Sequence, residues 1–415
     1  MIPFRSFARA AAVAALALPA LAQQPAPPKP ATPVIDGVSE HAMQVYRSAY
    51  VIDTHNDLPS KIADDSVNPD VRHPADQKVQ SDLPRFLESG ITAVFLSDFV
   101  DAKYALMKPD GSYAHAVLLA DTIHAFVKRH PKELLFATTA ADVERAKKEG
   151  KVAILIGVEG GHAIEGSLDK LRDLYKRGTR YMTLTWNNGN SWAGAAWGVN
   201  GTSTGGLTPF GVQVIHEMNT LGIFVDISHV SDSTFWDALK ASSKPVIASH
   251  SSARALSPHR RNMTDDMLRA VAKNGGVVNV NFYPGFIDSA YTNATARAED
   301  GVRAWRDSAL KAPGADSAAI KAEAAARTAA AVAAVPRPAL SVLLDHFDHI
   351  AKVAGVDHVG IGSDFDGIEV TPQQMEDVTM LPRIAQGLID RGYSDDDVRK
   401  ILGGNMLRVM KVVLR

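Results

Sequence analysis

Cysteine is absent from this chain of 415 residues. Disulfide bonds and thiolate metal ligands are therefore excluded, and the folded protein must be stabilised by burial of its core. A hydrophobic content of 46% over this length is sufficient for that purpose. Any metal site has to be built from nitrogen and oxygen ligands.

An excess of positive charge is also lacking. The chain has 44 Lys and Arg residues against 46 Asp and Glu residues, and the basic residues form no run or stripe. A protein that binds a phosphate backbone needs such a concentration of positive charge. The composition therefore excludes a nucleic-acid partner.

Long apolar runs are missing as well. The stretch Ala10–Leu18 is shorter than the roughly 20 residues of a membrane-spanning helix. Arg5 and Arg9 precede or border it, and Ala20-Leu21-Ala22 follows, as in an export signal cleaved after Ala22. We therefore expect a signal peptide over 1–22, a flexible Pro/Ala-rich linker over 23–40 and a single domain over 41–415. The mature protein is then periplasmic or secreted without a membrane span, and a retained N-terminal anchor is the alternative.

Eight short apolar runs are present, and amphipathic helical stretches separate them. The runs are Tyr50–Asp53, Ile91–Leu96, Val152–Val158, Tyr181–Leu184, Ile223–Ile227, Pro245–Ala248, Gly276–Val280 and His358–Ile361. Most are continuous rather than alternating, which is typical of parallel strands covered on both faces. The alternation of strand and helix predicts an α/β fold, a (β/α)8 TIM barrel.

Two segments depart from this alternation. A loop rich in Gly, Asn and Ser covers 188–208, and 294–336 contains an alanine-rich stretch, Ala318–Ala334, expected to be an exposed helical insertion. At the C-terminus, Leu381–Arg391 and Ser394–Leu414 are expected to be helices that close the base or side of the barrel.

Polar residues follow the apolar runs. They are His55, Asp57, Ser97, Asp98, Glu159, Thr185, Asn187, His229, His250, Asn281 and Asp364. Each residue alone is weak evidence for a functional site, since a histidine or carboxylate at the end of a strand is more often structural. In a (β/α)8 barrel, however, the C-terminal ends of all strands meet at one mouth, where active sites lie. We therefore expect these side chains to converge.

Three imidazoles (His55, His229, His250) and three carboxylates (Asp57, Glu159, Asp364) at one mouth fit a two-metal hydrolytic site. Two ions about 3.5–4 Å apart activate a bridging water and stabilise the oxyanion that develops. These ligands suit zinc best, with manganese or cobalt as alternatives. Asp364 is expected to take the proton of the water and pass it to the leaving amine.

Other polar residues have less definite roles. His346 and His349 are expected to be structural, because they lie in the helix before the last strand. His162 is either a turn residue or a support for the site. The cluster Arg260-Arg261-Asn262 is either a carboxylate-binding element or a solvated surface.

Six segments together resemble the membrane dipeptidases, renal dipeptidase-like enzymes of peptidase family M19 in the amidohydrolase superfamily. They are Val51–Pro59, Gly157–His162, Ser228-His229, Ser249–Ala253, Arg260–Asn262 and Gly362–Gly367. The resemblance implies a dipeptidase with two Zn²⁺ per subunit. His55 and Asp57 hold one ion, His229 and His250 the other, and Glu159 bridges both. Asp364 matches the acid/base residue and Arg261 the residue that binds the substrate's terminal carboxylate.

The family hydrolyses dipeptides, often with a D-residue at the C-terminal position, and its members are commonly homodimers. The chain differs from it at Trp186, where the family usually has a histidine that contacts the substrate. Asn187 is the substrate-binding residue expected in its place. Two other functions stay open: another binuclear amidohydrolase acting on lactams, lactones or N-acyl amino acids, and a non-catalytic solute-binding barrel.

Overall fold

The computed structural model describes residues 35–74, 79–198, 202–203, 205–312 and 315–415. The expected signal peptide and most of the expected linker lie outside these residues. The packed domain begins earlier than expected, because Ile35 is buried. Helix α1 (Glu40–Ser48) then starts at Glu40, where the side chain of Ser39 accepts a hydrogen bond from the Ala42 amide.

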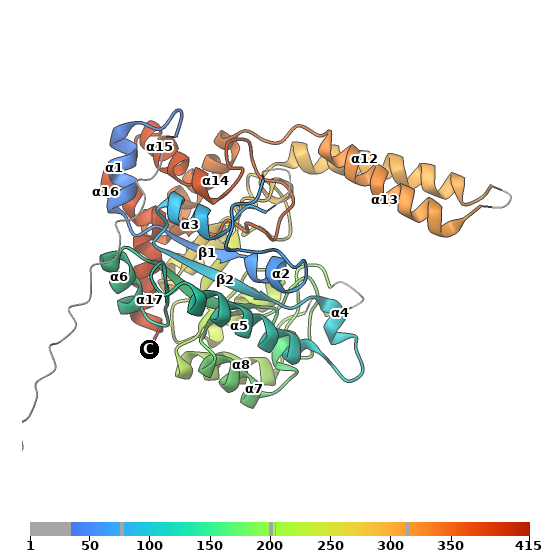
Figure 1. Ribbon diagram of the computed structural model, residues 1–415. Helices are drawn as coiled ribbons and strands as arrows, with labels where there is room; N and C mark the ends of the chain where they lie inside the picture. The colour runs from blue at the N-terminus through green and yellow to red at the C-terminus, as the bar shows by residue number, and fades with distance from the viewer. Residues whose placement is uncertain (1–34, 75–78, 199–201, 204, 313–314) are drawn as a thin grey trace, which may run out of the picture.

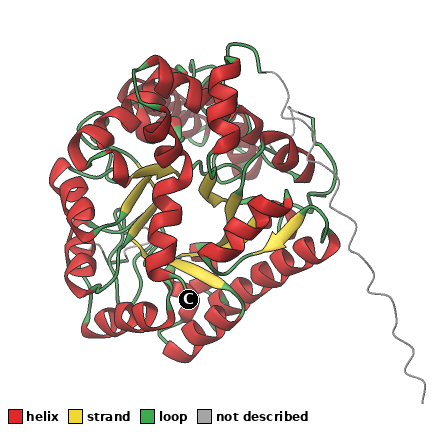
Figure 2. Cartoon of the chain, turned by 90° about the vertical axis from the view of Figure 1, so that its left-hand side faces the viewer, coloured by secondary structure: helices red, strands yellow, loops and turns green. Residues whose placement is uncertain are grey.

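Eight parallel strands close into a barrel, as the apolar runs predicted, and Figure 2 shows them inside a ring of helices. These strands are β1 (Ile52–Asn56), β2 (Ala93–Phe99), β4 (Val152–Glu159), β5 (Thr179–Thr183), β6 (Phe224–Asp226), β7 (Ile247–Ser251), β8 (Val277–Val280) and β9 (Val359–Ile361). Closure comes from β2, which pairs with β1 on one side and β4 on the other. The (β/α)8 barrel is thus confirmed.

One βα unit of the structure was not predicted. Strand β3 (Leu134–Phe136) pairs with the first half of β4, and helix α6 (Ala140–Glu149) follows it. The strand is too short to produce a clear apolar run. Helix α6 does carry a signal, a capping box in which Thr139 and Asp142 each accept a hydrogen bond from the other's backbone amide.

Helices cover the outside of the barrel (Figure 1). Besides α1 and α6, the α-helices of the described residues, most of them on the outside of the barrel, are α2 (Leu58–Ala63), α3 (Leu83–Ser89), α4 (Ala102–Ala105), α5 (Ser112–Arg129), α7 (Leu168–Lys176), α8 (Pro209–Leu221), α9 (Asp232–Ala241), α10 (Asp265–Asn274), α11 (Pro284–Ile287), α12 (Ser289–Ala309), α13 (Ser317–Ala333), α14 (Leu340–Ala354), α15 (Pro382–Asp390), α16 (Asp395–Arg399) and α17 (Asn405–Val413). No helix within the described ranges is long and apolar enough to cross a membrane.

The interior of the barrel is closed at its base by the C-terminal helix. Side chains of α17 such as Met406 and Met410 pack with the inward-facing residues Ile52, Phe95 and Phe224 in one apolar cluster. This agrees with the predicted role of the C-terminal helices. The predicted helix Ser394–Leu414 is interrupted, however, by a π-helical segment, Lys400–Gly404, that separates α16 from α17. Because the base is filled, a ligand would enter at the opposite mouth.

The predicted insertion is a hairpin of two helices that projects away from the barrel (Figure 1). Helix α13 lies one residue from the predicted bounds, Ala318–Ala334, while its partner α12 was not predicted. The two helices pack along each other, and the guanidinium of Arg327 lies 4.0 Å from the centre of the Trp305 ring. Most side chains of the hairpin are exposed, as expected for an insertion.

Candidate metal centre

The barrel brings together six polar residues that lie far apart in the sequence. His55 lies in β1 and His250 in β7, Glu159 is the last residue of β4, and Asp57 directly follows β1. His229 and Asp364 are each three residues beyond their strands, β6 and β9. All six are buried. They form what we call the His/carboxylate cluster, at the C-terminal mouth of the barrel.

Glu159 lies at the centre of the cluster. Its Oε2 is 3.4 Å from His55 Nε2, while its Oε1 is 2.9 Å from His229 Nε2 and 3.5 Å from His250 Nε2. The two carboxylate oxygens therefore face two different groups of ring nitrogens. This is the geometry in which one carboxylate can bridge two cations.

Two potential ligand atoms of the cluster, His55 Nε2 and Asp57 Oδ1, have no hydrogen-bond partner among the described residues. The carboxylate oxygens nearest to His55 Nε2, apart from those of Glu159, are Asp57 Oδ2 at 3.2 Å and Asp364 Oδ1 at 3.9 Å. His229 Nε2 and His250 Nε2 face each other at 2.9 Å. Because buried polar atoms are rarely left unpaired, the cluster fits bound cations. The sets His55, Glu159, His250 and His55, Asp57, Asp364 each have ligand atoms within 4.8 Å of one another.

A second set of side chains holds the three imidazole rings through their other nitrogen. Nδ1 of His55 lies 2.7 Å from the Tyr181 hydroxyl, Nδ1 of His250 lies 2.8 Å from Ser249 Oγ, and Nδ1 of His229 lies 3.0 Å from Asn187 Oδ1. Such contacts orient the rings and leave Nε2 free for a metal. Tyr181 and Ser249 were not predicted as functional residues. Asn187 was expected to bind substrate, and here it contacts His229.

Two glycines make this arrangement possible. A Cβ at Gly157 would lie 2.0 Å from the Tyr181 ring, so its absence lets Tyr181 reach His55 across the barrel. A Cβ at Gly367 would lie 2.2 Å from Asp57 Oδ2 and 2.5 Å from Asp364 Oδ1. At Gly157 the backbone lies close to Tyr181, and at Gly367 it lies close to the cluster itself.

Burial and neighbouring charges set the protonation of the cluster. Burial, with Arg261 and His55 adding, lowers the pKa of His229 to about 3, and burial lowers that of His250 well below its usual value. Both rings are therefore neutral at pH 7, the form that binds a metal. Burial opposes a charge on His55, yet Tyr181, Asp57 and Glu159 together raise its pKa well above the ordinary range. The proton that His55 then carries faces the carboxylates of Asp57, Glu159 and Asp364. A metal cation would bind at the same place.

Asp364 has the properties of a proton carrier. Burial, with Asp57 and Glu159 adding and His55 opposing, raises the pKa of its carboxyl to about 8. Asn281 Nδ2 donates a hydrogen bond to Asp364 Oδ2 at 2.9 Å. Both Asp364 and His229 have positive φ, 65° and 64°, a strained conformation for residues with a side chain. Such strain is common at functional sites.

Arg261 is buried, whereas its neighbour Arg260 is exposed. This excludes the solvated-surface alternative for Arg261. Its Nη2 donates to the His250 carbonyl at 3.2 Å, and its guanidinium lies 5.3 Å from the centre of the Phe286 ring. Among the described residues its Nε has no hydrogen-bond partner. Burial lowers its pKa to about 10, so it remains charged at neutral pH. A buried cation with an unpaired donor is suited to an anionic ligand.

Three further histidines make structural contacts. His346 contacts the Ala253 amide at 3.1 Å and the Ile287 carbonyl at 2.9 Å, and His349 pairs with Asp265 at 2.7 Å. Both predictions are confirmed. His162 lies 2.9 Å from the carbonyl of Val100 and holds the chain after β2.

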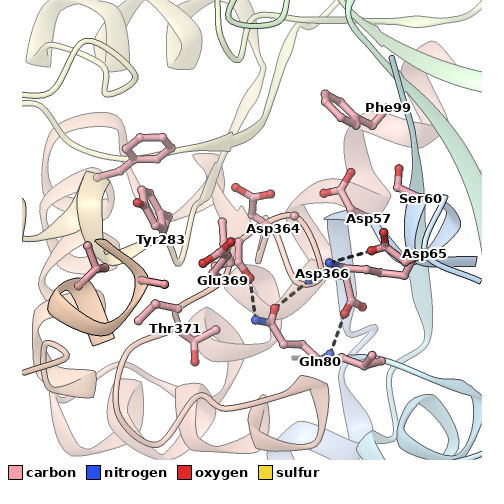
Figure 3. Close-up of a pocket in the computed structure, with 18 of the residues that line it drawn as sticks. Asp57, Ser60, Asp65, Gln80, Phe99, Tyr283, Asp364, Asp366, Glu369 and Thr371 are labelled. Atoms are coloured by element: carbon pink, nitrogen blue, oxygen red, sulfur yellow. Dashed lines mark hydrogen bonds and ion pairs between the residues drawn. The ribbon is translucent and has the colours of Figure 1, made fainter. Parts of the chain in front are cut away.

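A cavity of about 1220 Å³ opens above the cluster. Figure 3 shows Asp57 and Asp364 pointing into it, with Tyr283 on one side and Phe99 on the other. Residues of α13, among them Ala325, Ala329 and Val332, line its outer part. The insertion, to which no chemistry could be assigned from its composition, therefore contributes to the wall of the cavity.

A (β/α)8 barrel with buried histidines and carboxylates at its mouth defines a metal-dependent hydrolase. The family model described as membrane dipeptidase (peptidase family M19) matches residues 39–414. The chain therefore belongs to this family, and it is a metallo-dipeptidase.

Solved structures show the same fold. The probable dipeptidase PvdM from Pseudomonas aeruginosa is 26% identical, with a TM-score of 0.79 over 90% of this chain and 98% of that one. A dipeptidase described as a metallopeptidase of family M19 is 25% identical, with a TM-score of 0.69 over 88% and 99%. A metallopeptidase from Rhodobacter sphaeroides, solved with a phosphinate mimic of L-Ala-D-Ala, is 24% identical, with a TM-score of 0.68 over 88% and 99%.

Proposed function

We propose that the protein is a binuclear zinc dipeptidase that hydrolyses free dipeptides, including those with a D-residue at the C-terminal position. One observation carries the proposal: the two oxygens of the buried Glu159 face separate groups of imidazole nitrogens. A single metal ion would need ligand nitrogens on only one side of this carboxylate.

The assignment of residues to each ion is the one that the family resemblance implies, and the short distances within the cluster support it. His55 and Asp57 are proposed to hold one zinc ion, His229 and His250 the other, with Glu159 between them. Imidazole and carboxylate ligands without thiolate suit zinc. When bound, the two ions supply Lewis acidity and a water of lowered pKa.

Asp364 is proposed to manage the proton. Its carboxyl points into the cavity, and its raised pKa lets it exchange a proton near neutral pH. The carboxylate accepts a proton from the attacking water, and the resulting acid donates it to the amine nitrogen as the peptide bond breaks. The hydrogen bond from Asn281 keeps the carboxyl oriented toward the cluster during both steps.

Arg261 is proposed to bind the terminal carboxylate of the substrate. The positive charge of its guanidinium lowers the pKa of His229, while the charges of Asp364 and Glu159 raise the pKa of Arg261. Arg261 therefore lies within electrostatic reach of the cluster. A carboxylate held there places the adjacent peptide bond over the cluster. This geometry favours dipeptides over longer peptides, because the carboxylate and the scissile bond are one residue apart.

Replacing Arg261 with Ala is expected to lower kcat/KM for free dipeptides about 100-fold or more, mainly through KM. A charge-assisted bidentate pair in a buried site contributes on the order of 3 kcal/mol, and about 1.4 kcal/mol corresponds to a factor of ten. The measurement is a kinetic panel of L-Xaa-L-Xaa and L-Xaa-D-Xaa dipeptides with zinc-reconstituted enzyme. Arg260→Ala, at the exposed neighbouring position, is the matched control and is expected to behave as wild type.

The same variant separates the competing functions. A dipeptide amide has no terminal carboxylate, so its weak hydrolysis is expected to be insensitive to Arg261→Ala. Equal losses for dipeptides, amides and lactones would favour an amidohydrolase of another substrate class. No hydrolysis of any substrate by zinc-loaded wild type would favour the solute-binding barrel.

We also propose that the protein is exported, on the basis of the signal-like residues 1–22. Cell fractionation is expected to recover it from the periplasm or medium with residue 23 at its N-terminus. An unprocessed chain in the cytoplasmic fraction would contradict export. The homodimer implied by the family resemblance stays a prediction.

A further inference from the structure

Two aromatic side chains form one wall of the cavity. Phe99 is the last residue of β2, and Trp186 follows β5. Their rings meet edge to face, with centres 4.9 Å apart and planes inclined by 68°. Both residues line the cavity and both are only partly buried, so their remaining surface faces the space above the cluster. We call this pair the Phe99–Trp186 wall.

The order of the strands places Phe99 across the barrel from the loop that carries Arg261, and the ring of Trp186 lies against Phe99. Around the barrel the order is β1, β2, β4, β5, β6, β7, β8, β9. In a ring of eight, β2 lies opposite β7, whose following loop carries Arg261. Tyr283, after β8, lies on that same far side, and Figure 3 shows Tyr283 and Phe99 on opposite sides of Asp364.

The wall also lies next to Glu159. Phe99 is paired in register with Glu159 across the β2–β4 ladder. Trp186 adjoins Asn187, the residue that contacts His229. The His/carboxylate cluster thus lies between Arg261 on one side and the Phe99–Trp186 wall on the other.

From this arrangement we infer that the Phe99–Trp186 wall binds the side chain of the substrate's N-terminal residue and selects dipeptides in which that residue is large and apolar. The inference rests on the proposed function, because it takes the terminal carboxylate to lie at Arg261. With the scissile bond over the cluster, the N-terminal residue must extend beyond it, and consecutive Cα atoms are about 3.8 Å apart. The wall is the surface met on that side.

The chemistry of the wall decides which side chains it favours. Neither ring carries a charge, and a large apolar side chain placed against both removes apolar surface of substrate and enzyme from water. Glycine covers none of this surface. A carboxylate-bearing side chain would lose hydration against the two rings. The preference is therefore expected to increase with apolar size.

The test is a series of dipeptides with a constant C-terminal residue and Gly, Ala, Leu or Phe at the N-terminus. Wild-type kcat/KM is expected to be about 10- to 100-fold higher for Leu and Phe than for Gly, the range typical of apolar pockets. Trp186→Ala and Phe99→Ala are each expected to remove most of this preference, because kcat/KM falls more for the Leu and Phe substrates than for the Gly substrate. Trp186→Phe, which keeps an aromatic surface, is expected to retain it.

A second series, with a constant N-terminal Leu and varied C-terminal residues, is the control. The order of the kcat/KM values within this series is expected to be the same in wild type and in Trp186→Ala. Dissociation constants of phosphinate mimics with Gly or Phe at the first position provide a measurement independent of turnover, and they are expected to show the same loss of preference. Zinc content and unfolding temperature identify any variant that is misfolded.

Some outcomes would overturn the inference. Equal losses for all N-terminal residues, or losses that follow the C-terminal residue instead, would contradict a role for the wall at the N-terminal side chain. A wild type without preference for apolar N-terminal residues would do the same. In all these cases the dipeptidase activity itself persists, whereas failure of the proposed function would show as no dipeptide hydrolysis by any form of the enzyme.

Discussion

Glu159→Gln is expected to leave the protein folded but with fewer than two bound zinc ions per chain and with turnover reduced by about three powers of ten or more. A glutamine has one oxygen and one NH₂ group, so it cannot present an acceptor to both His55 and the pair His229 and His250. The loss of metal-based stabilisation of the transition state, several kcal/mol, corresponds to a reduction of that order.

Metal analysis of the purified protein and steady-state kinetics with excess zinc measure the two effects. A matched control is Glu149→Gln, an exposed carboxylate just before β4, at the end of the strand opposite Glu159. This variant is expected to bind two ions and to have wild-type activity. A Glu159→Gln enzyme with full zinc occupancy and normal turnover would rule out the bridging role of this carboxylate.

The positions of the cluster residues could be predicted because they follow from one property of the fold. Buried parallel strands produce continuous apolar runs, and residues that end such runs lie at one mouth. Glu159 directly follows the run Val152–Val158, and Asp364 follows His358–Ile361. This reasoning located the strands within a few residues and placed Glu159 and Asp364 at the same end of the barrel.

The side chains that support the cluster could not be found in this way. Tyr181 contacts His55 from 126 positions away, and this contact depends on the missing Cβ of Gly157. Tyr181 lies inside an apolar run, where it is indistinguishable from a core residue. Asn187 was assigned to the substrate from its place in the sequence alone, and its contact with His229 depends on the path of a loop.

Elements with weak local signals were also missed. Strand β3 has only three residues, and the break between α16 and α17 falls within a pattern typical of one continuous helix. Helix α12 was missed because Tyr291 is its one buried residue, so the helix has no broad apolar face. Only α13, with its alanine-rich sequence, had a strong helix propensity.

Asp364→Asn is expected to lower kcat by about 100- to 10,000-fold, the range of a positioned acid/base group, with two zinc ions still bound and KM little changed. The amide of asparagine can still accept the hydrogen bond from Asn281, so the backbone and side-chain positions are expected to be kept. It cannot accept a proton from water or donate one to the amine. Proton transfer is therefore lost while the ligands His55, Asp57 and Glu159 remain.

The same variant tests the raised pKa of Asp364 by a measurement without turnover. In the metal-free protein this pKa is about 8, against 3.8 for the ordinary carboxyl. Between these values the folded state keeps a proton that the unfolded state has released, so the stability of the folded state falls as pH rises from about 4 to 8. The asparagine side chain of the variant carries no such proton. The unfolding temperature of metal-free Asp364→Asn, relative to wild type, is therefore expected to increase across this pH range. The other titrating groups are common to both proteins, so a difference that stays constant with pH would mean that Asp364 has an ordinary pKa and is a poor candidate for the proton carrier.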